Sequence, residues 1–180
     1  MPVVNPPLVK DLLTGLLFPQ PYSGEMFLLR RDGVSFDATS GQYGKLSGSG
    51  SIHLSNTRLV FHSTKASKPT EFVSYELLLS EISEPNFKQP IFGANYLEGL
   101  SNVSRDKWKL TFYKGGCGTF LRVLNELLSE IARINRSMNE AVVLHYSPTS
   151  CNVGYVDPSD PSIVYVQQPV QASAPPPPAE

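Results

Sequence analysis

The feature that most constrains the fold is one amphipathic helix that follows a long series of alternating segments. Between residues 120 and 136, apolar side chains recur at spacings of three and four, which places them on one face of a helix: Phe120, Leu124, Leu127, Leu128, Ile131 and Ile134. Thr119 is a suitable N-terminal cap, so we predict a helix over residues 119–137. A single helix of this kind must bury its apolar stripe against a sheet.

The segments before this helix have the pattern of antiparallel strands. Residues 26–30 and 34–38 flank Asp32-Gly33, a two-residue turn signal, and predict a first hairpin. Residues 39–50 are rich in glycine and serine and predict a surface loop, and residues 52–62 predict a second hairpin that turns at residues 55–57. Residues 72–82 are again apolar, and residues 107–113 alternate strictly, with Trp108, Leu110 and Phe112 on the core face.

This order of elements predicts a mainly β fold with one C-terminal helix. About seven antiparallel strands would form two bent sheets, closed into a barrel by the helix. We assign the domain to residues 25–140.

The two ends of the chain differ from the domain in composition. Residues 1–24 predict a strap on the barrel, with a short helix that starts at Pro7 and has one apolar face, made of Leu8, Leu12, Leu13 and Leu16; the alternative is an interfacial membrane helix. Residues 141–180 predict a disordered proline-rich tail. It ends in four consecutive prolines, a candidate ligand for proline-reading domains: Pro175, Pro176, Pro177 and Pro178.

The charge balance argues against general electrostatic binding. Among 180 residues, 15 are basic and 16 acidic, so we expect no direct binding to nucleic acid and no general attraction to an anionic membrane. The N-terminal stretch lacks the basic residues of a signal peptide, and no segment is long and apolar enough to span a bilayer. We therefore expect an intracellular, soluble protein.

The inventory of reactive side chains favours a protein that is not an enzyme and has no cofactor. Cys117 and Cys151 lie far apart without metal-ligand spacing, so neither a disulfide framework nor a zinc site is predicted. Cys117 precedes a helix, but no histidine is predicted beside it for nucleophilic catalysis. His53 and His62 are interpreted as partly exposed strand residues, and His145 lies in the tail.

One stretch carries more information than its strand pattern. Pro90 keeps Gln89 extended, so Ile91 and Phe92 are predicted to begin a core strand, with a bulge at Gly93. The full stretch reads Lys88-Gln89-Pro90-Ile91-Phe92-Gly93-Ala94-Asn95-Tyr96-Leu97-Glu98-Gly99. We call it the signature stretch.

The signature stretch resembles that of the WW domain-binding protein 2 family, whose N-terminal part is a GRAM domain of the pleckstrin-homology-like class. Two further segments fit the resemblance: residues 109–120, and a GRAM-type hairpin over residues 50–61, of which we single out Gly50, Leu54, Asn56, Arg58 and Phe61. The matches together span about residues 25–140. The resemblance does not decide whether the signature stretch contacts a partner or only packs in the core.

The resemblance implies an adaptor that acts as a transcription coactivator with chromatin-bound proteins, in the nucleus and cytoplasm. Its partners would be transcription factors or proline-reading domains. Members of that family bind WW domains through Pro-Pro-x-Tyr motifs, which this sequence lacks, so WW binding is not carried over.

The alternative function is a peripheral membrane adaptor that binds phosphoinositides. Arg58, Lys65 and Lys68 are the candidate lipid-binding residues, expected around one mouth of the barrel.

Overall fold

The computed structural model describes residues 2–12, 15–64 and 72–139. Ten strands and two helices lie in these ranges. The predicted tail, with Pro175 to Pro178, lies outside the described residues, as do Lys65 and Lys68. The division at residues 24 and 140 stays a prediction.

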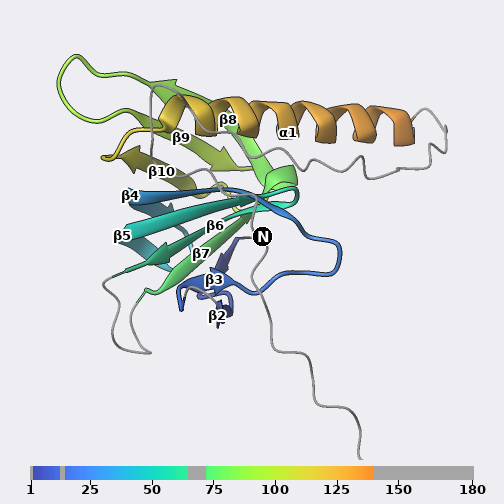
Figure 1. Ribbon diagram of the computed structural model, residues 1–180. Helices are drawn as coiled ribbons and strands as arrows, with labels where there is room; N and C mark the ends of the chain where they lie inside the picture. Colours follow the sequence, from blue (N-terminus) through green and yellow to red (C-terminus); the bar gives the residue numbers. More distant parts are fainter. Residues whose placement is uncertain (1, 13–14, 65–71, 140–180) are drawn as a thin grey trace, which may run out of the picture.

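An eight-stranded antiparallel sheet forms the body of the molecule (Figure 1), in the order β1-β7-β6-β5-β4-β10-β9-β8. A separate hairpin pairs β2 (Leu8–Lys10) with β3 (Leu17–Pro19), and η1 (Leu79–Glu81) is a short 3-10 helix. The strands of the large sheet are β1 (Val3–Val4), β4 (Phe27–Ser40), β5 (Gly44–Ser55), β6 (Arg58–Ser63), β7 (Ser74–Leu78), β8 (Ile82–Lys88), β9 (Tyr96–Ser101) and β10 (Lys107–Phe112).

The predicted C-terminal helix is confirmed as α1 (Cys117–Asn139). Figure 1 shows α1 lying across β8, β9 and β10, on the side opposite to β2 and β3. Phe120 and Leu124 are fully buried, and the ring of Phe120 lies 5.2 Å from that of Phe112 on β10. The helix begins two residues before Thr119, so this residue lies inside the first turn and is not the predicted cap.

The first predicted hairpin is wrong, because residues 27–40 form the single long strand β4. The sequence Asp32-Gly33 makes a β-bulge there, with Gly33 at a φ of 68°. A bulge of this kind inserts one residue and bends the strand without ending it. The chain reverses instead at residues 41–43, so the loop predicted over residues 39–50 is mostly the first half of β5.

The predicted N-terminal helix is also wrong, since Leu8 and Phe18 belong to the β2–β3 hairpin. Gly15 has a φ of 70°, and its N–H donates to the carbonyl of Asp11 at 2.8 Å, which closes the turn. Pro7 and Pro19 favour extended backbone at the ends of the hairpin. The strap role survives in another form, because residues 3–5 pair with β7 and Phe18 is buried against the sheet.

Candidate interaction site

The signature stretch is divided between a strand and an exposed loop. Sheet pairing between β8 and β9 stops at Lys88 and Tyr96, and residues 89–95 form the loop between them. Ile91 is 93% exposed and Phe92 is 92% exposed. The prediction that they begin a core strand is therefore wrong. Pro90 has no N–H to offer a neighbouring strand, and Gly93 adopts a φ of 112°, so the chain turns here.

The second half of the signature stretch, residues 96–99, belongs to β9 and packs in or against the core. Leu97 is fully buried, and Gly99 lies opposite Trp108 on β10. A Cβ atom at Gly99 would lie 2.5 Å from Cζ2 of Trp108, so only glycine leaves room for the indole. Tyr96 packs under the Lys109 ammonium, 4.1 Å from the centre of the ring. These residues have structural roles, which leaves residues 88–95 as the part offered to solvent.

The exposed loop is fixed to the rest of the barrel at its base. The N–H of Phe112 donates to the carbonyl of Asn95 at 2.9 Å, which holds the loop beside the end of β10. Tyr113 follows directly and is 70% exposed. The stem of Lys114 covers Gly33, where an added Cβ would lie 2.6 Å from its Cγ. The β8–β9 loop and the loop between β10 and α1, which contains Tyr113 and Lys114, therefore lie at the same end of the molecule, as Figure 1 shows.

The hairpin predicted over residues 50–61 is confirmed as part of β5 and β6, and its residues stabilise the fold. Leu54 and Phe61 are core residues, and the Asn56 side-chain oxygen accepts a hydrogen bond from the Met26 N–H at 2.9 Å. At Gly50 the two strands approach so closely that a Cβ would lie 1.9 Å from the His62 carbonyl oxygen.

Arg58 is completely buried, which contradicts its proposed role at a lipid site. Its Nε and Nη2 donate to the two carboxylate oxygens of Glu25, each at 2.7 Å, and its Nη1 donates to Glu76. The guanidinium also lies 3.8 Å from the centre of the Tyr22 ring. Arg58 thus ties residues 20–25 to the outer face of the sheet, and it is not available to a headgroup.

The outer face of the same sheet carries two buried histidines, which corrects the interpretation of them as partly exposed. His53 has no exposed surface and His62 only 4%, and their rings lie 5.2 Å apart. Phe18 of the β2–β3 hairpin covers His53 at 4.9 Å. Burial, together with the charge of Arg30, lowers the pKa of His62 to about 4; burial and the neighbouring His62 place that of His53 well below its ordinary value.

Cys117 is buried at the start of α1, and burial raises the pKa of its thiol to about 12. A thiol of this kind is a poor nucleophile. Within the part of the chain that the structure describes, no group of three or more histidine, cysteine, aspartate or glutamate side chains is placed to hold a metal ion. None of the described helices combines the length and apolar character needed to cross a membrane.

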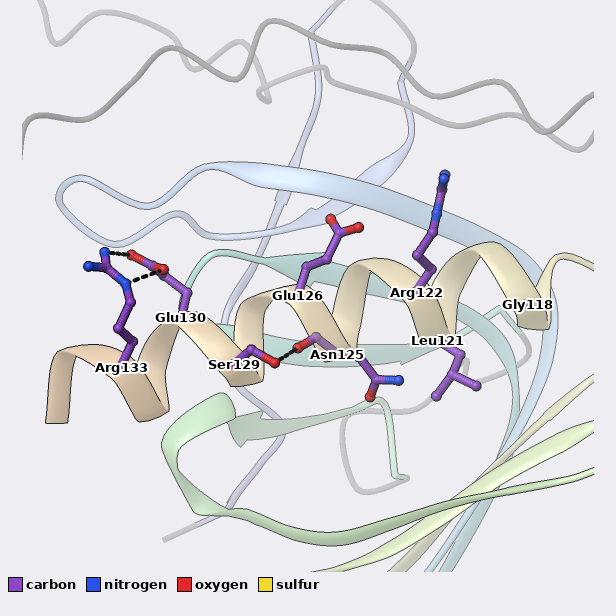
Figure 2. Close-up of a pocket in the computed structure, with 8 residues that line it drawn as sticks. All are labelled: Gly118, Leu121, Arg122, Asn125, Glu126, Ser129, Glu130 and Arg133. Carbon is purple, nitrogen blue, oxygen red and sulfur yellow. Dashed lines mark hydrogen bonds and ion pairs between the residues drawn. The ribbon is translucent and has the colours of Figure 1, made fainter. Parts of the chain in front are cut away.

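One side of α1 carries a hollow in which three polar side chains, Ser129, Glu130 and Arg133, interact within the helix. Figure 2 shows Arg133 paired with Glu130, and the Ser129 hydroxyl donating to the carbonyl of Asn125 at 2.7 Å. Leu121 points to the opposite side from Arg122. The hollow therefore has the character of a solvated helix face.

Sequence reasoning missed the polar surface buried under the N-terminal segment. One signal for it was present: polar residues occupy the outward positions of the second hairpin, among them His53, Arg58 and His62. A second missed signal was Pro90 followed by Gly93, since proline and glycine close together are typical of a turn.

A large antiparallel sheet followed by one C-terminal helix gives this chain a pleckstrin-homology-like fold. Among solved structures it is similar to the Vps36 N-terminal PH domain, with 18% sequence identity and a TM-score of 0.53, over 69% of this chain and 93% of that chain. A chain of the 8S snRNP assembly intermediate also matches at 9% identity, over 76% of this chain and 95% of that one; its TM-score of 0.35 is too low to carry an argument.

No family model matches this chain, and no curated protein does. The likeness to the Vps36 domain supports the fold and, at this level of identity, nothing beyond it. Membership in the WW domain-binding protein 2 family therefore stays a proposal.

Proposed function

We propose that this chain is a non-catalytic adaptor whose contact surface is the exposed half of the signature stretch, residues 88–95. The observation that carries this proposal is the almost complete exposure of Ile91 and Phe92 at the tip of an anchored loop. Leaving two large apolar side chains side by side in water gives up the stabilisation of burying them, and an exposed apolar group of this kind is typical of an interaction site.

The burial and pairing of the reactive side chains support a non-catalytic role. Arg58 is held between two carboxylates, His53 is enclosed, and the Cys117 thiol is buried. Each of these groups stabilises or fills the fold. The pleckstrin-homology-like fold is itself an interaction fold without a catalytic centre of its own.

The finer proposal is a coactivator-type adaptor that works with chromatin-bound proteins, in the nucleus and cytoplasm. It rests on the resemblance of the signature stretch to the WW domain-binding protein 2 family. Because the sequence has no Pro-Pro-x-Tyr, its protein partners would be transcription factors or domains that bind the prolines at residues 175–178.

The alternative proposal is a peripheral membrane adaptor. Arg58 no longer supports a phosphoinositide site at the barrel mouth, since it is buried in ion pairs. What favours a membrane contact is the apolar loop itself.

Quantitative capture of partners by the tagged full chain tests the proposed contact surface. The test variant carries Ile91→Asp with Phe92→Asp, and the matched control carries Tyr43→Asp with Val103→Asp, two exposed apolar positions in other loops. Partners should be lost with the loop variant and kept with the control. Equal capture by both variants would refute residues 88–95 as the contact surface.

The coactivator proposal has a separate test. Removing residues 141–180 should abolish capture of the proline-binding partners, leave capture through residues 88–95 unchanged and keep the domain folded, as judged by circular dichroism. Capture of the proline-binding partners that survives this truncation would place their binding on the domain.

A further inference from the structure

One end of the large sheet gathers exposed apolar side chains next to basic ones, a composition typical of surfaces that contact membranes. It consists of Ile91 and Phe92 on the β8–β9 loop and Tyr113 on the β10–α1 loop, with Lys88 and Lys114 beside them; we call it the apolar end. Its three apolar side chains are 93%, 92% and 70% exposed. Figure 1 shows the β8–β9 loop projecting away from the sheet, so the apolar end is convex.

The charges at the apolar end are of one sign. The segments that build it, residues 85–97 and 107–125, contain no aspartate or glutamate, although the whole chain has a net charge of −1. The acidic residue at the bulge, Asp32, already accepts a hydrogen bond from Arg30 at 2.8 Å. The two segments therefore contribute positive charge next to the apolar side chains, with Lys88 at the end of β8 and Lys114 directly after Tyr113.

We propose that the apolar end inserts into a lipid bilayer with anionic headgroups, a proposal that rests on residues 88–95 being the contact surface. A convex tip needs no matching pocket when it enters acyl chains, and Ile91 and Phe92 are its most exposed apolar side chains. The Tyr113 ring suits the interfacial layer, since it has an apolar body and a polar end. Lys88 and Lys114 would meet the lipid phosphates.

The contact is weak when it acts alone. Burial of one isoleucine and one phenylalanine raises membrane partitioning on the order of a hundredfold to ten-thousandfold. Two lysines near an anionic surface add about tenfold or more. Stable membrane attachment usually takes two such signals, so a partner bound elsewhere on the adaptor would complete it.

Vesicle co-sedimentation of the purified full chain tests the insertion. The probes are vesicles of phosphatidylcholine alone and vesicles of phosphatidylcholine with phosphatidylserine, without phosphoinositides. We expect binding to both, stronger with phosphatidylserine. Ile91→Asp with Phe92→Asp should reduce binding about a hundredfold on both vesicles. Lys88→Gln with Lys114→Gln should remove only the preference for phosphatidylserine, as high salt should.

The matched control is Tyr43→Asp with Val103→Asp, which removes the same number of exposed apolar side chains from loops away from the apolar end. The control should bind as the wild type does. No wild-type binding to either vesicle, or equal binding by the loop variant, would overturn the insertion. If partner capture still depended on Ile91 and Phe92 in that case, the proposed contact surface would stand and its occupant would be a protein.

A second measurement reports the depth of insertion. The single native tryptophan, Trp108, is 2% exposed, so its emission should be nearly insensitive to vesicles. In a Phe92→Trp variant we expect the added emission to shift to shorter wavelength on binding and to be quenched by lipids brominated on their acyl chains. Emission that stays unshifted with vesicles present would contradict insertion.

Discussion

Acidification from pH 7.5 to pH 5 should destabilise this domain through its two buried histidines. His53 and His62 lie side by side on the outer face of β5 and β6, under Phe18, with Arg30 close by. Protonation would place a second and third positive charge in a site that is closed to water. Burial therefore keeps both rings neutral in the folded state, with the pKa of His62 at about 4.

The direction of the change in the free energy of unfolding follows from the lowered pKa values of the two histidines. Below pH 6.5, unfolded histidines take up protons while the folded ones do not, so the free energy of unfolding falls as the pH falls. For a folded pKa of about 4, the loss at pH 5 is about 2 kcal/mol. Burial also lowers the pKa of His53, so His53 adds to this loss in the same direction. The part from His62 alone is already a sizeable share of the stability of an ordinary domain, which is about 5–15 kcal/mol.

The carboxylates of Glu25 and Asp32 do not mask the effect of the histidines between pH 5 and 7.5. Burial opposes their ionisation, but hydrogen bonds from Arg58 to Glu25, and from Ser51 to Asp32, hold the pKa of each carboxyl below its ordinary value. Their stabilisation is complete above the unfolded pKa values of about 4–4.5 and is lost only at lower pH. Between pH 5 and 7.5 the histidines should dominate.

Urea unfolding, followed by Trp108 fluorescence at several pH values between 5 and 7.5, measures the effect. The double substitution His53→Gln with His62→Gln should flatten the pH dependence whatever it does to stability at pH 7.5. His145→Gln should leave the slope unchanged. A free energy of unfolding that is flat in the wild type, or a slope that persists in the double variant, would refute the reasoning.

Three further predictions test other parts of the fold. Arg58→Met leaves two buried carboxylates without their counter-ion and should cost about 3–5 kcal/mol in urea unfolding; an unchanged midpoint would show that the ion pairs are not buried in solution. Gly50→Ala should destabilise by about 3 kcal/mol or more, because its methyl group meets a backbone carbonyl, whereas Gly118→Ala, which meets open space, should be neutral or slightly stabilising. In a Cys151→Ser background, Cys117 should react with iodoacetamide at pH 8 at least about a hundredfold more slowly when folded than when unfolded, and equal rates would contradict its burial.

Regular periodicity made the helix and the last strand predictable. The spacing of Phe120 and Leu124, and the alternation of Trp108 and Leu110, are local patterns that their burial confirms. The bulge at Gly33 has the same local sequence as a turn, so nothing nearby distinguishes a bend from a reversal. Only the pairing of β4 with β5 and β10 along its length decides it.

The candidate site was harder to predict, because the burial or exposure of its residues depends on contacts with residues far away in the sequence. Arg58 meets Glu25 across 33 residues and Glu76 across 18, so its burial depends on how the N-terminal segment covers the sheet. By hydrophobicity alone, Ile91 and Phe92 look like core residues. Their exposure follows from the end of the β8–β9 ladder at Lys88, which the hydrophobic pattern does not mark.

Photo-crosslinking in intact cells tests the central claim most directly, namely that the exposed half of the signature stretch is the contact surface. A photoreactive phenylalanine analogue would replace Phe92 in one full-length variant and Val103 in another. The account predicts crosslinked products, to lipid or to protein, at position 92 and few or none at position 103. No product at position 92, or equal yields at the two positions, would contradict it.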